Sequence, residues 1–185
     1  MIVLNGGSSS GTSTLARSLQ RRLGPSWLTL GVDDLLRALP GGDDPVTGPA
    51  SLHVGPGGTV AVDDDFRRAE AAWYRGVAAM VRGGVGVVVD EVLLGGAASQ
   101  ARMAEALAGV DVVWVGVRCD PEVAARREEG RPERIPGMAR DQAERVHAGV
   151  AYDVVVDTAD AGPEACAEAV MAFLARRAAP SASTP

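Results

Sequence analysis

The sequence contains no lysine, and all 18 of its basic residues are arginines. Aromatic residues make up only 4% of the 185 residues, and there are only two cysteines, Cys119 and Cys166. Two cysteines in a chain of this length do not form a disulfide framework, so we interpret both as buried thiols. The lack of lysine has a chemical consequence, because a site that needs a strongly basic side chain must use arginine.

Long hydrophobic runs and a positive net charge are also missing. No apolar run reaches the ~18 residues that suggest a membrane span, and the longest, such as Val85–Val89, have the length of a strand. Met1 leads directly into apolar residues 2–4, which argues against a signal peptide and makes the cytoplasm the expected location. The formal net charge of −6 disfavours a nucleic-acid surface, where affinity rests on dense positive charge. We expect no membrane and no nucleic-acid partner, and a homo-oligomer is compatible with the sequence.

What the sequence does contain is an alternation of short apolar runs with segments of helical period. Leu15, Leu19 and Leu23, for example, recur at every fourth residue and therefore share one helix face. The pattern predicts a single α/β domain over residues 1–177, with a five-stranded parallel sheet and helices on both faces. The predicted strands are residues 2–4, 27–32, 85–89, 110–117 and 154–156, and the predicted helices after the first are 34–39, 66–82, 97–107, 121–129, 137–148 and 163–177.

Two segments depart from this alternation. Residues 41–65 hold six of the 23 glycines and three of the 11 prolines. Within them, residues 53–54 and 59–62 flank a glycine-rich turn, which predicts a small hairpin. We interpret residues 41–65 as an insertion that covers the substrate. The tail, residues 178–185, consists of Ala, Pro, Ser and Thr and is predicted to be disordered.

The segment between the first predicted strand and the first predicted helix matches a phosphate-binding loop. Its spacing of Gly6, four residues, Gly11, one residue and Ser13 fits the template in all but one place. The glycines let the backbone turn its N–H groups toward phosphate oxygens, and the helix N-terminus adds the positive end of a dipole. Ser13 would place its hydroxyl on Mg²⁺. The residues that we expect to bind the nucleotide are Gly6, Gly7, Ser8, Ser9, Ser10, Gly11, Thr12, Ser13 and Thr14.

Thr12 is the departure from the template, which has lysine at this position. Threonine offers a hydroxyl without a charge, and losing one charge-assisted hydrogen bond costs about 1.5–3 kcal/mol. Two hypotheses follow from this substitution. Either an arginine replaces the lysine in an active phosphotransferase, or the protein binds a nucleotide or another ligand without catalysing transfer.

Carboxylates follow two of the predicted strands, at the edge of the sheet where the phosphate loop also lies. Asp90 follows the apolar run 85–89, as the carboxylate of a Walker-B strand does, and would hold Mg²⁺ directly or through water. Asp33 and Asp34 follow the second strand. One of them would cap the next helix and the other would face the phosphates, and the pattern alone does not say which. Glu91 either belongs to the same cluster or is solvated.

Residues 126–137 form an arginine-rich segment after the fourth predicted strand. Glycines and prolines at positions 130, 132, 136 and 137 interrupt its helical pattern, as the hinges of a mobile lid would. Arginine suits phosphate binding because its planar fork binds two oxygens at once. Such a lid would supply the charge that is missing at Thr12, and the alternative is a solvated, charged helix face.

Several stretches together resemble the chloramphenicol phosphotransferase family of actinomycetes. The resemblance runs from Met1 to about Thr158, and its most specific parts are residues 31–33 (Gly-Val-Asp) and 114–120. The other matching stretches are residues 5–9, 27–30, 94–98 and 152–154. The resemblance implies an adenylate-kinase-like P-loop fold. It also implies an ATP- and Mg²⁺-dependent kinase that phosphorylates a hydroxyl of an antibiotic, with chloramphenicol as a candidate acceptor.

The resemblance also implies roles for individual residues. Asp33 matches the family's catalytic carboxylate, which takes the proton from the substrate hydroxyl, and Asp90 matches the carboxylate that closes the third strand. The arginines that match the family's lid are Arg127, Arg131 and Arg134. This chain departs from the family at Thr12, where the family has lysine, and over residues 41–65, where the resemblance is weak. A nucleoside or nucleotide kinase is the other activity that the fold class permits.

Overall fold

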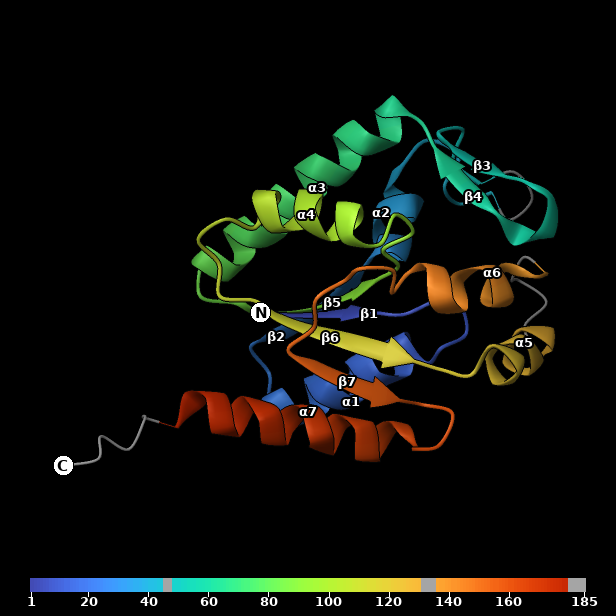
Figure 1. Ribbon diagram of the computed structural model, residues 1–185. Coiled ribbons are helices and arrows are strands. Elements are labelled where there is room, and N and C mark those ends of the chain that lie inside the picture. The colour runs from blue at the N-terminus through green and yellow to red at the C-terminus, as the bar shows by residue number, and fades with distance from the viewer. Residues whose placement is uncertain (45–47, 131–135, 180–185) are drawn as a thin grey trace.

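The computed structural model describes residues 1–44, 48–130 and 136–179 (Figure 1). Its main sheet has five strands in the spatial order β2-β5-β1-β6-β7, and every neighbouring pair is parallel. The five-stranded parallel sheet expected from the alternating pattern is therefore confirmed. Its strands are β1 (Ile2–Asn5), β2 (Trp27–Gly31), β5 (Gly86–Glu91), β6 (Val113–Arg118) and β7 (Val154–Asp157).

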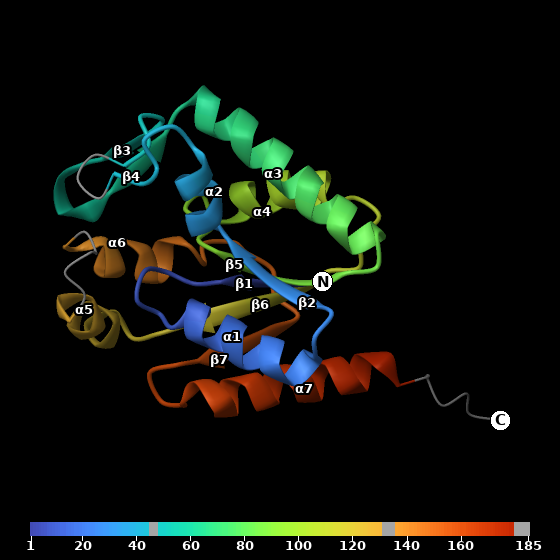
Figure 2. The same ribbon diagram turned by 180° about the vertical axis from the view of Figure 1, so that it is seen from behind.

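Helices cover both faces of this sheet, as predicted. On one face α1 (Thr12–Leu23) lies beside α7 (Pro163–Ala178), and on the other face α3 (Asp64–Arg82) lies beside α4 (Ala97–Ala106) (Figures 1 and 2). The central strands are therefore covered on both sides, which is why their sequences are apolar without alternation.

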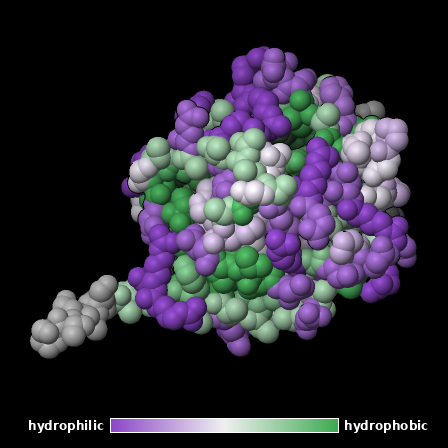
Figure 3. All heavy atoms as spheres, in the orientation of Figure 1, coloured by the Kyte–Doolittle hydropathy of each residue, from purple (hydrophilic) through white to green (hydrophobic). Residues whose placement is uncertain are grey.

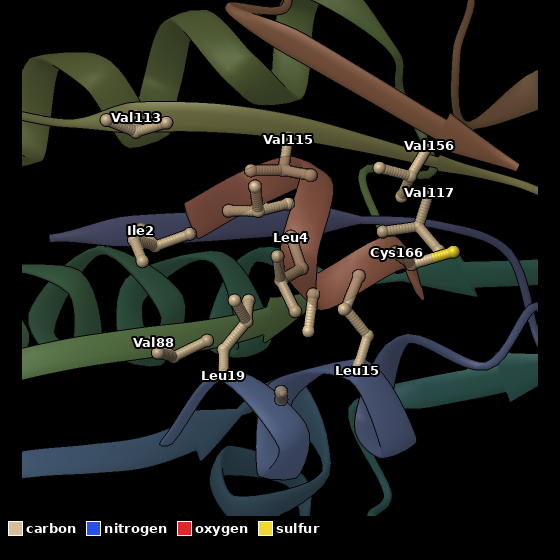
Figure 4. Close-up of a cluster of buried hydrophobic side chains, with 13 residues drawn as sticks. Ile2, Leu4, Leu15, Leu19, Val88, Val113, Val115, Val117, Val156 and Cys166 are labelled. Atoms are coloured by element: carbon tan, nitrogen blue, oxygen red, sulfur yellow. The ribbon is translucent and has the colours of Figure 1, made fainter. Parts of the chain in front are cut away.

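Strand β1 divides its side chains between two hydrophobic clusters. Ile2 and Leu4 are fully buried on one side, where they meet Leu15 and Leu19 of α1 (Figure 4). Val3 points to the opposite side and packs in the cluster under α3 and α4. Because β1 is fixed on both faces, the loop that follows it starts from a rigid position. The two cysteines are buried and free, as predicted.

Three shorter helices lie near the carboxyl edge of the sheet: α2 (Val32–Ala38), α5 (Pro121–Glu129) and α6 (Met138–Arg145). Asp120 caps α5 by accepting hydrogen bonds from two backbone N–H groups of its first turn, at 2.9 and 3.0 Å. The proline that begins α5 needs no N–H partner at that position. These features explain why the sequence pattern located the start of α5 correctly.

Two of the predicted boundaries are wrong by several residues. The strand predicted over 110–117 begins only at Val113, because the chain turns after α4 and the Val110 N–H donates to the Leu107 carbonyl at 2.9 Å. The helix predicted over 137–148 ends at Arg145, and the chain turns through Gly149 at φ +68°. In both cases apolar residues beyond the element extended the pattern without extending the structure.

The predicted hairpin is confirmed. Strands β3 (Leu52–Val54) and β4 (Val60–Val62) pair antiparallel, and the short 3₁₀ helix η1 (Pro56–Gly58) connects them. The backbones of Gly58 and Met138 approach so closely that there is no space for a Cβ atom at Gly58. The hairpin is therefore supported by α6.

Parts of the predicted insertion and tail lie outside the described residues. These are residues 45–47 of the insertion and residues 180–185 of the tail. Ala178, which the pattern assigned to the tail, is instead the last residue of α7.

Within the described residues, no helix is long and apolar enough to cross a membrane. The face of the molecule in Figure 3 is largely hydrophilic, and its hydrophobic residues form separate areas. Large apolar side chains that are exposed include Leu28, Val54, Met80 and Val155. They come from different elements, and scattered exposed apolar residues are normal on protein surfaces.

Gly76 provides a test of helix stability away from any site. It is a solvent-exposed residue in the middle of α3, and a Cβ atom there would meet nothing within 4 Å. Since glycine costs a helix roughly 0.5–1 kcal/mol relative to alanine, Gly76→Ala is expected to raise the midpoint of thermal unfolding by about 1–4 °C. Gly24→Ala is the matched control. Gly24 also has open space around it, but its φ of +103° strains any other residue, so a gain in both variants would contradict this explanation.

Candidate active site

The loop between β1 and α1 curls back toward the sheet. The Gly6 N–H donates to the Glu91 carbonyl at 3.2 Å, and the Ser10 N–H donates to the Gly7 carbonyl at 3.1 Å. Gly11 has φ +91°, and Ser9, at φ +59°, is the only residue other than glycine with a positive φ in the described part of the chain. Backbone strain of this kind is typical of ligand-binding turns.

Gly6 has no space for a side chain. A Cβ atom there would lie 2.5 Å from the Ser10 hydroxyl oxygen, 2.7 Å from a methyl group of Thr12 and 2.8 Å from the Val117 carbonyl oxygen. The glycine that the sequence pattern placed at the start of the loop is therefore required by the close approach of the loop to β6.

Three hydroxyl groups of the loop are buried without a hydrogen-bond partner among the described residues. They belong to Ser8, Ser9 and Ser10. An unsatisfied buried polar group is costly unless a ligand satisfies it. The loop also leads into the N-terminus of α1, whose first N–H groups lack partners within the helix and attract anions. The phosphates of a nucleoside triphosphate would satisfy both the buried hydroxyls and the N-terminus of α1.

A cavity of about 470 Å³ opens above this loop, and we call it the phosphate cavity. Besides the loop residues, it is lined by Asp33, Asp90, Arg17 and Arg37. Asp90 is brought there by the sheet, because it lies in register with Leu4 of β1. The structure therefore brings the predicted loop and both predicted carboxylates into one cavity.

Ser13 also lines the phosphate cavity, as Asp90 does. Among the described residues, no group of three or more His, Cys, Asp or Glu side chains forms a metal site by itself. Mg²⁺ commonly binds through one or two protein oxygens together with phosphates and water. A hydroxyl and a carboxylate facing a phosphate site fit that mode of binding.

The structure distinguishes the two adjacent aspartates. The Gly31 N–H donates to one carboxylate oxygen of Asp34 at 2.8 Å, and Arg37 donates to the other at 2.5 Å. Asp34 thus closes the first turn of α2. Asp33, in the same turn, lines the phosphate cavity and also a second cavity next to it.

The second cavity has a volume of about 230 Å³, and we call it the apolar cavity. Its walls come from α2, the hairpin, the start of α3, the loop after β5 and α6. Asp33 and Ser8 lie where this cavity meets the phosphate cavity, since both line the two. The apolar residues of its walls are Val32, Leu36, Leu52, Val60, Val62, Phe66, Val92, Leu93, Leu94 and Met138.

A few polar side chains also line the apolar cavity. Glu70 receives two hydrogen bonds from Arg67, at 2.9 and 3.0 Å, and the Tyr74 hydroxyl is hydrogen-bonded to the Glu91 carboxyl. Sequence reasoning missed Arg67, Glu70 and Tyr74. The only signal was helical spacing, which places Phe66, Glu70 and Tyr74 on one face of α3.

Glu91 is only 2% exposed, which excludes the alternative that its side chain is solvated. Burial is the main cause that raises the pKa of its carboxyl from 4.5 to about 8. Between about pH 4.5 and pH 8, the folded protein therefore holds a proton on this carboxyl that the unfolded chain has already released. The free energy of unfolding should fall as the pH rises through this window.

Replacement of Glu91 by glutamine tests this pH dependence. Each unit of pKa shift corresponds to about 1.4 kcal/mol, so the parent protein should lose on the order of a few kcal/mol of stability across the window. The Glu91→Gln variant should lose much less. Urea unfolding without Mg²⁺ at several pH values measures both. Glu105→Gln, an exposed position on α4, should keep the parent slope, and an equal slope in all three proteins would refute the assignment.

Arg127 is connected to the phosphate loop through Thr158, the residue that follows β7. Its guanidinium donates to the Thr158 carbonyl at 2.7 Å and to the Thr158 hydroxyl at 3.2 Å, and that hydroxyl donates to the Ser10 carbonyl at 2.5 Å. Arg127 thus supports the loop from the side of β7, and it is not among the residues that line the two cavities. Arg131 and Arg134 lie outside the described residues, so the lid predicted over 126–137 stays a prediction.

The class of fold can be identified before the family, from the order of the strands and from the phosphate loop. Similar solved structures include a sugar kinase from Janibacter sp. HTCC2649, with a TM-score of 0.69 and 16% identity, covering 94% of this chain and 93% of that chain. A gluconokinase from Sinorhizobium meliloti 1021 has a TM-score of 0.64 and 21% identity, with 96% and 92% covered. A shikimate kinase from Acinetobacter baumannii, solved with shikimate, has a TM-score of 0.61 and 16% identity, with 97% and 94% covered. The predicted P-loop kinase fold is confirmed.

The family follows from the sequence. The chain belongs to the family described as "Chloramphenicol phosphotransferase-like protein", whose model matches residues 1–175. A relative from Mycobacterium tuberculosis (strain ATCC 25618 / H37Rv), named "Putative O-phosphotransferase Rv2636", is 31% identical over 179 residues, which span 85% of this chain and 74% of the relative. The resemblance stated from the motifs is confirmed, and family and fold together support a small-molecule kinase.

Proposed function

We propose that the protein transfers the terminal phosphate of ATP to a hydroxyl group of a small molecule with an apolar body, such as an antibiotic of the chloramphenicol type. One observation carries this proposal: Asp33 lines both the phosphate cavity and the apolar cavity. A carboxylate at that junction is placed to accept the proton of a hydroxyl that enters from the apolar cavity and attacks the phosphate.

The other site residues have roles that follow from their positions. The loop from Gly6 to Thr14 cradles the phosphates with its serine hydroxyls and with N–H groups other than those of Gly6, Ser8 and Ser10, which donate to protein acceptors. Ser13 and Asp90 are the residues that would hold Mg²⁺, and the bound ion would neutralise charge on the phosphates. The protein's own contribution is mainly to align the hydroxyl with the phosphate and to exclude water.

The walls of the apolar cavity favour an acceptor that is not a polyol. Each hydroxyl of a sugar needs its own polar partner in a specific site, and a polar group left unpaired on burial is costly. Aliphatic and aromatic residues dominate these walls, with a few polar groups around Glu70 and Glu91. An acceptor with an aromatic or aliphatic body and few polar groups matches that lining.

The test is to incubate the purified protein with ATP, Mg²⁺ and a panel of acceptors. The panel contains chloramphenicol, nucleosides, aminoglycosides and gluconate, and mass spectrometry detects phosphorylated products. We expect phosphorylation of the phenicol. Phosphorylated nucleosides as the sole products would instead identify a nucleoside kinase.

A second candidate function is binding without transfer. The observation that favours it is Thr12, whose uncharged side chain is buried in the loop where the template has lysine. This alternative predicts that ATP raises the thermal unfolding temperature while no acceptor of the panel gains a phosphate.

A further inference from the structure

The phosphate cavity contains a limited set of cationic side chains. Among the described residues, Arg17 and Arg37 are the two that line it. Three aspartates, Asp33, Asp34 and Asp90, line it as well. A bound triphosphate would add further negative charge, and Thr12 adds no positive charge from the loop. A cationic side chain in this cavity would offset part of that negative charge and bind phosphate oxygens directly.

The charge of Arg37 is already compensated. Its guanidinium donates to Asp34 at 2.5 Å, and the second oxygen of Asp34 accepts the Gly31 N–H at 2.8 Å. Arg37 is therefore tied to the first turn of α2. Moving it toward a phosphate would break an ion pair and leave the cap of that helix weaker.

Arg17 differs from Arg37 in this respect. It is exposed on α1, and within the described part of the chain its guanidinium makes no hydrogen bond or ion pair. The next arginine on the same helix face, Arg21, is bonded to Glu164 at 2.9 Å, away from the cavity. Of the arginines of α1, Arg17 is the one that lines the phosphate cavity with its charge uncompensated.

The position of Arg17 on the helix directs it toward the loop. It follows Ser13 by four residues, so the two side chains share one face of α1. Side chains of an α-helix lean toward its N-terminus and cover the preceding turn. A long arginine side chain that leans this way crosses the turn of about 5.4 Å between the two residues and reaches the N-terminus of α1.

We propose that Arg17 replaces the missing loop lysine by binding oxygens of the terminal phosphates of the nucleotide with its guanidinium. This inference rests on the proposed kinase function, and it adds the residue that supplies the charge. The planar guanidinium binds two phosphate oxygens at once. The arrangement also explains how a chain without lysine retains a phosphate loop that is complete in its other residues.

The experiment combines two substitutions, Arg17→Ala and Thr12→Lys, singly and together. Arg17→Ala should lower kcat/KM for ATP about 10- to 100-fold, the effect of losing one charge-assisted contact. Thr12→Lys alone should change it by less than about threefold, because the charge is already present. In the Arg17→Ala background, Thr12→Lys should restore most of the activity. Arg17→Lys should lie between Arg17→Ala and the parent, because it keeps the charge and loses the fork.

ATP affinity, measured by calorimetry without an acceptor, gives a readout that does not depend on transfer. Arg17→Ala should weaken ATP binding, and Thr12→Lys should restore it in the double variant. Arg75→Ala is the control, because Arg75 is exposed on α3 and does not line the cavity. Its ATP affinity should equal that of the parent.

Two results would overturn the inference. One is parent-like ATP affinity and turnover in Arg17→Ala. The other is an equal gain from Thr12→Lys in the parent and in the Arg17→Ala background, since independent effects exclude a shared role. If the parent phosphorylates no acceptor, the kinase proposal fails. The ATP affinities of the four proteins then still decide whether Arg17 serves as the phosphate-binding cation.

Discussion

Replacement of Asp33 by asparagine is expected to lower phosphate transfer by about 10²- to 10⁴-fold, the typical contribution of a positioned general base. ATP affinity should change little, because the loop that binds the phosphates is untouched. The shape of the side chain is preserved, so the folded structure should be as well. Single-turnover measurement of transfer, together with calorimetric titration of ATP, separates the two effects.

The matched control for this substitution is Asp65→Asn. Asp65 is an exposed acidic residue of α3 that pairs with Arg68 on the helix surface. This variant should transfer phosphate at the parent rate. Should Asp33→Asn also do so, the junction between the two cavities would not be where the hydroxyl reacts, and the proposed mechanism would be wrong.

Replacement of Gly6 by alanine is expected to reduce transfer about 100-fold, the scale of effect produced by a displacement of roughly 1 Å in an active site. The new Cβ atom would lie 2.8 Å from the Val117 carbonyl oxygen, which β6 holds in place, so the loop must move instead. Overpacking of this kind also costs about 1–3 kcal/mol of stability. Single-turnover transfer and thermal unfolding of the same variant measure these two consequences, and ATP titration shows whether the affinity for the nucleotide falls together with transfer.

The Gly76→Ala variant serves again as the comparison for this loop substitution. It adds the same methyl group in open space on α3, and it should leave ATP affinity unchanged. If Gly6→Ala bound ATP as tightly as Gly76→Ala does, the loop would have tolerated the clash. The close packing of the loop against β6 would then have no role in nucleotide binding.

The sequence predicts most of the fold because the sheet is buried on both faces. Strand β5, for example, contains the apolar run Val87–Val89, in which consecutive residues face opposite sides of the sheet and all are buried. The phosphate loop is predictable in part from local geometry, because Gly11 has φ +91° and a Cβ atom at Gly6 would clash with Ser10 and Thr12 of the same segment as well as with β6. Patterns that arise from local geometry can be read without knowing what packs against them.

The choice between Asp33 and Asp34 could not be predicted. The pattern places the start of the helix at residue 34, but α2 begins at Val32 and holds both aspartates in its first turn. Which one caps the helix depends on the path of the chain out of β2, where the Gly31 N–H points at Asp34. That path is set by the sheet and not by the local sequence.

The walls of the apolar cavity were also beyond sequence reasoning. Arg67, Glu70 and Tyr74 read as an ordinary amphipathic stretch of α3. Their role depends on where α3 crosses the end of β5 and on how the hairpin closes over it. These are contacts between segments far apart in the sequence, and no short motif encodes them.

Helix α6 contacts both halves of the site. Gln142 accepts the Ser8 N–H at 2.7 Å, which ties the helix to the phosphate loop, and Met138 supports the hairpin at Gly58. A ligand that shifts one of these contacts must act on the other through the same rigid element. ATP and the acceptor would then change each other's affinity by the same factor, as thermodynamic reciprocity requires, and neither dissociation constant would be a property of its own cavity alone.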